Sequence, residues 1–412
     1  MDRLAEHLRR TWYTARRRWR GDGRRLFRLV VEKARWLNDA RSPVVLMIDD
    51  LANVWHSRTG GACWEAGGDW GGGCWDSASA LSSLEQGLLR DFPEARTTFF
   101  VVAGALSAYT THQPFSHSAP IDATAKSRAF FSGLARDPRF ELAYHGYNHG
   151  TPGATTAEFV QEWRGFPDLA TALEQTRKGL EIFERATGSR PRGGKYGGWD
   201  YNEFAEEVVD ASGFDWWCRD WMPRDYSGRV APGYYEPQYF GPRLLVGLPS
   251  TVHGYFWARR QIDVLLQQRQ LIAIEEHIAP VRPDGLIQTP NIIDDMEQLR
   301  RLYAYLRGHD VWHANCSEIA DYVAARDQTL IYDVTDEGFS IRCDGAAGKP
   351  LSLVTDCSAI CTADQPLIDI IAPDGSALPD TAYRFDLARH RHLVTVRLQP
   401  GRYRVRPTSA RR

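Results

Sequence analysis

The sequence predicts an α/β domain built on a parallel sheet, open or closed into a barrel, followed by a small all-β sandwich. Between residue 44 and about residue 325, short apolar runs typical of buried strands alternate with amphipathic helical patterns. After about residue 328 only short strand patterns occur, separated by turn pairs such as Asp344-Gly345 and Pro400-Gly401. We therefore expect a helical arm over residues 1–41, an α/β domain over residues 42–327 and a β-sandwich over residues 328–412.

The expected elements follow one another in the order that βαβ units require. The strand patterns of the α/β domain cover residues 44–49, 97–102, 140–144, 244–246, 271–275 and 311–313. Its helical patterns cover residues 77–90, 126–135, 169–186, 202–211, 260–268 and 291–306. Strands of the tail are expected at residues 331–334, 339–343, 351–354, 367–371, 383–386, 393–398 and 403–405. A Gly- and Trp-rich stretch over residues 60–75 lacks periodicity and is expected to be a long loop.

The composition is that of a globular chain. Hydrophobic residues make up 43% and charged residues 25% of the 412 residues, which excludes a disordered chain, a collagen-like repeat and a coiled coil. No apolar run approaches the roughly 18 to 20 residues of a membrane-spanning helix, and no secretory signal is expected. The seven cysteines lack zinc-knuckle or CxxC spacing, so we expect a reducing, cytoplasmic location. The 14 Trp, 17 Tyr and 17 Phe residues would suit a sugar ligand if exposed, or fill core space if buried.

Basic charge is concentrated at the start of the chain. Residues 1–41 hold 13 Lys and Arg against 5 Asp and Glu, so this arm carries a net charge of +8 and the remainder −10. Two helical patterns are expected in the arm, the second running from Leu26 to Leu37. The first has a basic face, and it either lies on an anionic membrane surface or packs its apolar stripe against the protein itself. No DNA-binding motif accompanies the charge, so no nucleic-acid partner is expected. The apolar stripe consists of Leu4, Leu8, Trp12, Ala15 and Trp19.

Acidic and imidazole side chains follow two of the expected strands. Asp49 and Asp50 end the strand pattern VVLMIDD, at the edge of a parallel sheet where active sites collect. The pattern FELAY runs directly into HGYNH, which places His145 and His149 four residues apart. If the turn between them is helical, both imidazoles lie on one side. Two imidazoles and one carboxylate form a set of three ligands that leaves positions open for water and substrate, as a catalytic metal requires.

These motifs resemble those of the polysaccharide deacetylase family, also called the NodB-homology or carbohydrate esterase 4 family, over about residues 42–325. The resemblance implies a distorted (β/α) barrel. It also implies that Asp49 is the catalytic base, that Asp50, His145 and His149 are metal ligands, and that the cofactor is one divalent ion, expected to be Zn²⁺.

Further motifs of the family have looser counterparts in this chain. SRPRGGKYGGWD resembles the third motif and offers Arg192 and Tyr196 as substrate-binding residues. FDWWCRDW resembles the fourth, with Asp215 and Trp216 in the pocket. LIAIEEH offers His277 as the general acid that ends the fifth motif. His253 in STVHG competes with His277 for this role.

The function implied by the resemblance is a metal-dependent hydrolase that removes acetyl groups from an N-acetylated or O-acetylated sugar. The family chemistry would use a metal-activated water, Asp49 to take its proton, a backbone N–H near Tyr196 to stabilise the developing charge, and His277 to protonate the leaving group.

Two alternatives stay open. In the first, a glycoside hydrolase would use Asp49 with Asp50 or Glu275 with Glu276, although neighbouring residues of a strand point to opposite faces. In the second, the protein binds glycans without catalysis, through the β-sandwich and the aromatic loops.

Overall fold

The computed structural model describes eleven stretches of the chain, which form two compact units. The larger unit contains the described residues between Ala34 and Gln328 together with Gly348–Ser352. The smaller unit combines the described residues up to Lys33 with those between Thr329 and Ala347 and from Leu353 onward. The described residues are 29–57, 63–64, 80–113, 115, 117–219, 237–249, 252–253, 259–277, 289–356, 367–386 and 391–408.

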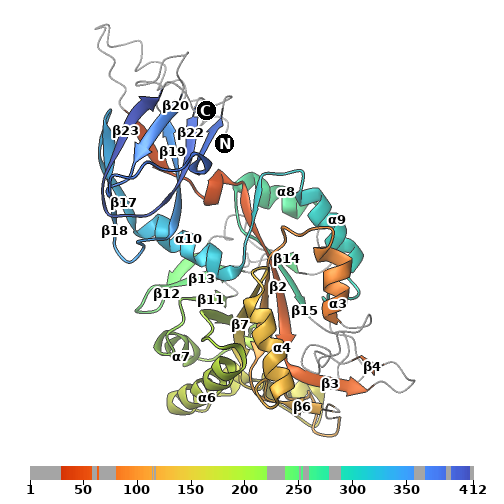
Figure 1. Ribbon diagram of the computed structural model, residues 1–412. Coiled ribbons are helices and arrows are strands. Elements are labelled where there is room, and N and C mark those ends of the chain that lie inside the picture. Colours follow the sequence, from red (N-terminus) through yellow and green to blue (C-terminus); the bar gives the residue numbers. More distant parts are fainter. Residues whose placement is uncertain are drawn as a thin grey trace, which may run out of the picture. The chain divides into compact units, whose positions relative to one another are not determined.

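A predominantly parallel sheet forms the centre of the larger unit (Figure 1). Its strand order is β12-β13-β11-β10-β7-β5-β2-β15-β14, with β16 paired to the start of β2. The ladder between β12 and β13 is antiparallel, whereas the ladders through β2, β5, β7, β10, β11 and β15 are parallel. The strands are β2 Ser42–Leu51, β5 Thr97–Val102, β7 Phe140–Gly146, β10 Gly193–Lys195, β11 Trp216–Arg219, β12 Gln238–Phe240, β13 Leu245–Pro249, β14 Val252–His253, β15 Ile272–His277 and β16 Val311–His313.

Strand β2 lies in the middle of this sheet, and all ten of its residues are buried. Val44, Leu46 and Ile48 belong to the apolar core that also contains side chains of the surrounding helices. The intervening residues Val45 and Met47 point to the other face of the strand and are equally inaccessible. Burial on both faces is typical of a parallel sheet covered by helices. The predicted α/β fold is confirmed, because strands and helices alternate along the chain as the sequence pattern requires.

Helices cover the outside of the sheet, and Figure 1 shows α4 and α6 packed beside β7. The longest helix, α6, begins where the Asp168 carboxylate accepts a hydrogen bond from the Thr171 N–H at 2.7 Å. It ends at Gly188, whose φ of 87° lies in the left-handed region that favours glycine. The helices are α3 Ala80–Leu84, which continues as a π-helical turn over Glu85–Leu89, α4 Ala125–Arg136, α5 Glu162–Gly165, α6 Leu169–Thr187, α7 Ala205–Ala211, α8 Arg259–Gln268, α9 Met296–Leu306 and α10 Cys316–Gln328.

The barrel is incompletely closed. The sheet runs from β12 to β14, and no ladder joins β13 to β14 among the residues that the structure describes. Short antiparallel pairs lie next to the carboxyl ends of β2 and β7. These are β3 Asn53–Ser57 with β4 Cys63–Trp64 and β6 His117–Ala119, and β8 Gly150–Thr151 with β9 Val160–Gln161. The distorted barrel expected from the sequence is therefore the architecture observed.

The smaller unit consists of two antiparallel sheets, β1-β19-β22-β21 and β17-β18-β23-β20. The alternate residues of β22 are buried, as expected for a strand with one face in a core. The rings of Phe339 and Tyr403 on neighbouring strands stack at 5.3 Å between centroids. The strands are β1 Val30–Lys33, β17 Thr329–Thr335, β18 Gly338–Cys343, β19 Pro350–Asp356, β20 Leu367–Ile371, β21 Tyr383–Asp386, β22 Arg391–Arg397 and β23 Gly401–Thr408.

Strand β1 corrects one prediction. The second helical pattern of the arm includes Val30 to Lys33, yet these residues pair with β19 in antiparallel register. Valine favours extended backbone, and the edge of the sheet satisfies the hydrogen-bonding groups of this segment. The first helix expected in the arm lies outside the described residues, as does the long loop over residues 60–75 except for β4. None of the described helices combines the length and apolarity that crossing a membrane requires.

Candidate metal centre

A β-bulge brings Asp49 and Asp50 to the same site at the end of β2. The ladder between β2 and β5 shifts register between Ile48 and Leu51, and Asp50 has a φ of 65°. This left-handed residue interrupts the alternation of side chains, so the two neighbouring carboxylates both reach groups on the inner side of the sheet. The expectation that neighbouring aspartates point to opposite faces is wrong at this position.

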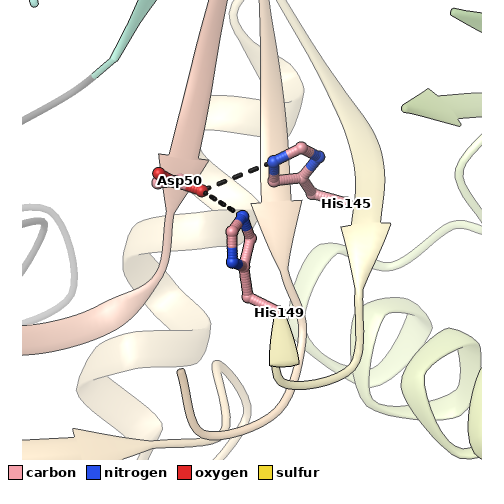
Figure 2. Close-up of side chains that lie close together, drawn as sticks. All are labelled: Asp50, His145 and His149. Atoms are coloured by element: carbon pink, nitrogen blue, oxygen red, sulfur yellow. Dashed lines mark ion pairs between the residues drawn. The ribbon is translucent and has the colours of Figure 1, made fainter. Parts of the chain in front are cut away.

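Asp50 lies between the two histidines of the HGYNH motif (Figure 2). Its Oδ1 atom is 3.4 Å from Nε2 of His145 and 3.2 Å from Nε2 of His149. One ligand atom from each of the three side chains falls within 4.8 Å of the others. All three residues are less than a tenth exposed. The structure therefore brings together the three side chains that the sequence proposes as metal ligands.

The turn between the histidines is not helical, in contrast to the expectation. His145 lies in strand β7, Gly146 has a φ of 125°, and His149 has a φ of 72°. The carboxylate of Glu162 accepts hydrogen bonds from the backbone N–H groups of Tyr147, Asn148 and His149 at 2.8, 2.9 and 2.7 Å. A side chain at Gly146 would collide with this carboxylate, 2.6 Å from the position of its Cβ. Glu162 is a residue that the sequence patterns did not reveal, because it acts through backbone groups 13 to 15 residues away.

Strand β10 orients the imidazoles from the other side. Nδ1 of His145 is 3.1 Å from the carbonyl oxygen of Lys195 and donates to it, which leaves Nε2 to face Asp50. Gly197 passes close to the ring of His149, and a Cβ at this glycine would lie 3.0 Å from the imidazole. Both histidines therefore present Nε2 to the same carboxylate.

The charges of the centre favour a cation. Burial by itself would raise the pKa of Asp50, but His149 and His145 hold that pKa well below its usual value. Burial would lower the pKa of His149, and the Asp50 carboxylate outweighs this effect, so the pKa of His149 is raised. Asp50 is thus ionised and supplies a buried negative charge that faces both imidazoles.

Asp49 faces a buried ammonium group that the sequence predictions missed. Nζ of Lys195 lies 2.6 Å from Oδ2 of Asp49 and 3.0 Å from Oε1 of Glu275. Oδ1 of Asp49 is buried and accepts no hydrogen bond in the described part of the chain. Burial would lower the pKa of Lys195, but the carboxylates of Asp49 and Glu275 raise it. The ammonium is therefore charged and holds one oxygen of Asp49.

A compositional signal for Lys195 is present in the sequence. The chain has only five lysines among its 50 Lys and Arg residues, so each lysine is conspicuous in the sequence. The other four are exposed or half-buried, whereas the Lys195 side chain is 1% exposed. An ammonium is compact and donates in three directions, which suits a cation placed between two carboxylates. The five lysines are Lys33, Lys126, Lys178, Lys195 and Lys349.

His277 ends β15 beside the centre. It stands opposite Asp49 in the β2–β15 ladder and follows Glu275 by two residues, so both side chains lie on the inner face of the strand. Nδ1 of His277 donates to the Pro290 carbonyl at 2.8 Å, which leaves Nε2 as the second ring nitrogen. Its charge is among those that lower the pKa of Asp50. His253 pairs with Glu275 in the neighbouring ladder, but its side chain lies outside the described residues.

Two of the four predicted substrate contacts lie at the opposite end of the sheet. Arg192 and Asp215 precede β10 and β11, and the Arg192 guanidinium binds Asp215 and Asp321 at 2.8 Å. They occupy the amino ends of strands whose carboxyl ends lead toward the metal centre. Arg192 and Asp215 are therefore surface ion-pair residues, and assigning them to the pocket was wrong.

The other two predicted contacts are buried aromatic residues. Trp216 donates from its indole N–H to Ser317 at 2.8 Å, and its ring is 6.3 Å from Phe100, which in turn lies 6.0 Å from His145. The Tyr196 ring packs in the outer core against Trp163 and Trp217. Both side chains are completely buried, so neither can contact a substrate directly.

Comparisons with known proteins concern the fold. The barrel is similar to those of polysaccharide deacetylases. A protein of Mycobacterium smegmatis described as a "putative polysaccharide deacetylase" is 18% identical at a TM-score of 0.44, over 72% of this chain and 94% of that one. A probable polysaccharide deacetylase of Pseudomonas aeruginosa PAO1 is 16% identical at a TM-score of 0.45, over 70% of this chain and 93% of that one. The Puue allantoinase is 14% identical at a TM-score of 0.45, over 70% of this chain and 92% of that one.

No family model and no curated protein matches the sequence. The strand ladders of the larger unit establish its fold.

Proposed function

We propose that the protein is a metal-dependent hydrolase that removes acetyl groups from an acetylated sugar. One observation carries the proposal. The ligand set Asp50, His145 and His149 lies next to a carboxylate, Asp49, whose Oδ2 is held by a buried ammonium and whose Oδ1 accepts no hydrogen bond in the described part of the chain. A metal that only stabilises a fold has four protein ligands, whereas a catalytic metal keeps a position open. The resemblance of the HGYNH and double-aspartate motifs to those of deacetylases agrees with this interpretation.

The three residues fit a divalent ion of the zinc type. Two neutral imidazoles and one carboxylate are the donor set that such ions prefer, and the second ring nitrogen of His145 is already bonded to a carbonyl. A divalent ion bound there would lower the pKa of a coordinated water and polarise the acetyl carbonyl. Asp50, His145 and His149 would hold the ion.

Asp49 is the proposed base. Lys195 binds Oδ2 and so fixes the orientation of the carboxylate, while Oδ1 remains the atom that accepts the proton from the attacking water. The register of the β2–β15 ladder places His277 opposite Asp49. With Nδ1 of His277 donating to Pro290, Nε2 is the atom that would deliver a proton to the leaving nitrogen or oxygen of the sugar.

The carboxylate pairs of a glycoside hydrolase do not fit this arrangement. Both aspartates reach the site, but Asp49 is bound to Lys195 and Asp50 lies between two imidazoles. Glu275 belongs to the inner face of β15, whereas Glu276 is 0% exposed, and burial raises its pKa to about 9. Neither pair offers one protonated and one ionised carboxyl group facing a common sugar.

The test is acetate release by purified protein from N,N′,N″-triacetylchitotriose and from acetylated xylan. We expect turnover that is lost on dialysis against a chelator and restored by Zn²⁺. A zinc-loaded protein that binds either carbohydrate but releases no acetate would contradict the proposal and favour the non-catalytic alternative.

A further inference from the structure

Two side chains that the proposed chemistry leaves without a role surround the Lys195 ammonium. Oε1 of Glu275 lies 3.0 Å from Nζ of Lys195 and also accepts the indole N–H of Trp199 at 3.0 Å. The ring of Trp199 lies over the same ammonium, with Nζ 4.2 Å from the ring centroid. Glu275, Trp199 and Lys195 therefore contact one another, and Lys195 connects them to Asp49.

The position of Trp199 is imposed by its surroundings. Its φ of 56° lies in the left-handed region, which is uncommon for a residue with a large side chain. Such a conformation costs about 1–3 kcal/mol and persists where tertiary contacts determine it. The contacts here are the bond to Glu275 and the ring over Lys195. Gly197, at the start of the turn Gly197–Trp199, closely approaches the ring of His149. This turn therefore contacts both a proposed metal ligand and the Lys195 ammonium.

The set also determines where the ammonium can lie. A lysine side chain has four rotatable bonds and binds a carboxylate as a point charge, so Asp49 alone would leave its position poorly defined. A second carboxylate and an aromatic face restrict Nζ to the point between Asp49 and Glu275. The backbone carbonyl of Lys195 also accepts a hydrogen bond from Nδ1 of His145. Lys195 therefore contacts both the proposed base, Asp49, and the proposed metal ligand, His145.

We propose that Glu275 and Trp199 are positioning residues of this centre, which hold the Lys195 ammonium so that Asp49 keeps its orientation toward the ligand set. This inference rests on the proposed function. Neither residue touches the reacting atoms, and both act through Lys195. The half-buried indole offers another role, a platform for the sugar ring, and the kinetic constants separate the two because a platform affects KM and a positioning residue affects kcat.

The test makes the same substitution, Glu to Gln, at two neighbouring positions of β15. In the zinc-loaded full chain, Glu275→Gln is expected to lower kcat for triacetylchitotriose about tenfold or more while KM and zinc content stay near wild type. Glu276→Gln, on the other face of the strand, should leave kcat unchanged. Trp199→Phe keeps a ring over the ammonium and should lose less activity than Trp199→Ala. A kcat for Glu275→Gln equal to that of Glu276→Gln, or a raised KM at constant kcat in the Trp199 variants, would overturn the proposal.

Crystal structures of the same two glutamate variants give a result that does not depend on turnover. In Glu276→Gln, Nζ of Lys195 should remain within hydrogen-bond distance of both Asp49 and Glu275. In Glu275→Gln it should lose one of these two contacts, and an ammonium that has not moved would refute positioning by Glu275. If the wild-type protein releases no acetate, the proposed function fails, and these structures still decide whether Glu275 positions Lys195.

Discussion

The two ends of the parallel sheet both carry charged side chains, but they use them differently. At the amino ends, Arg192 pairs with Asp215 and Asp321, and the side chains of Arg192 and Asp215 are 43% and 50% exposed. At the carboxyl ends, Lys195 and Asp49 are almost completely buried, and Asp50 has left-handed backbone. Exposed ion pairs contribute little to stability, and buried charges persist only when their surroundings define them. Chemistry is therefore expected at the carboxyl ends and structural ion pairing at the amino ends.

The largest difference between the two ends is expected in turnover. Asp49→Asn removes the proposed base but no metal ligand, so acetate release should fall by about 10²–10⁴-fold while zinc content stays near wild type. Asp215→Asn, the matched change at the amino end, should leave kcat within about twofold, because the exposed Asp215 carboxylate pairs with the Arg192 guanidinium at the far end of the sheet from the centre. Steady-state kinetics of the two variants measures this difference. Equal losses in both would mean that the two ends do not differ in function.

A second difference is expected in stability. Lys195→Met leaves Asp49 and Glu275 buried without their cation, which should lower the free energy of unfolding by about 3–5 kcal/mol. Arg192→Met breaks exposed ion pairs and should cost about 0–1 kcal/mol. Urea unfolding of the metal-free proteins, followed by far-ultraviolet circular dichroism, compares the two. A smaller effect for Lys195→Met than for Arg192→Met would contradict the distinction between buried and exposed charges.

Glu276 tests whether burial alone creates a functional residue. Burial and the charges of Asp295 and Glu275 raise its pKa to about 9. Because the folded pKa lies above the unfolded value, stability from this group is present at about pH 4.5 and is lost as pH rises toward 9. Glu276→Gln should remove this loss, which for one proton is at most about 1.4 kcal/mol per pH unit. Unfolding measured between about pH 5 and pH 8 checks it, and an unchanged pH dependence in the variant would show that Glu276 is ionised in the fold.

The smallest effect on the centre is expected from the basic arm. A deletion should stop at residue 28, because β1 begins at Val30 and belongs to the β-sheet of the smaller unit. We propose that residues 1–28 bind anionic membrane surfaces, so the deletion should abolish sedimentation with vesicles containing phosphatidylserine and leave acetate release unchanged. High salt should also weaken the binding of the full chain. Unchanged sedimentation after the deletion would favour packing of the apolar stripe against the protein.

Most elements were predictable because buried strands and amphipathic helices leave a periodic pattern. The expected strands at 97–102, 311–313, 367–371 and 383–386 coincide with β5, β16, β20 and β21. Strand β10 was missed because Gly193–Lys195 has no apolar run, and strand β11 because Trp216–Arg219 was interpreted only as part of the FDWWCRDW motif. Arg192 and Asp215 directly precede these two strands. Because the strands were not predicted, both residues were assigned to the wrong end of the sheet.

The grouping of Asp50, His145 and His149 was predictable, and the residues that support this group were not. Asp50, His145 and His149 follow strand ends at a spacing that suggests metal binding. Glu162, Lys195 and Glu275 support the centre through contacts between distant segments, and such contacts leave no local pattern. The bulge at Asp50 was equally hidden, because a left-handed aspartate depends on the surrounding sheet and not on its neighbours in sequence.

The central claim is that Asp50, His145 and His149 hold a catalytic divalent ion. The most direct measurement is the zinc retained by purified protein after dialysis against metal-free buffer, determined by atomic emission for wild type, Asp49→Asn and His145→Ala. We expect about one ion per chain in wild type and in Asp49→Asn, and less than about a tenth of this in His145→Ala. Zinc retained equally by His145→Ala and by wild type would show that these residues are not the ligands.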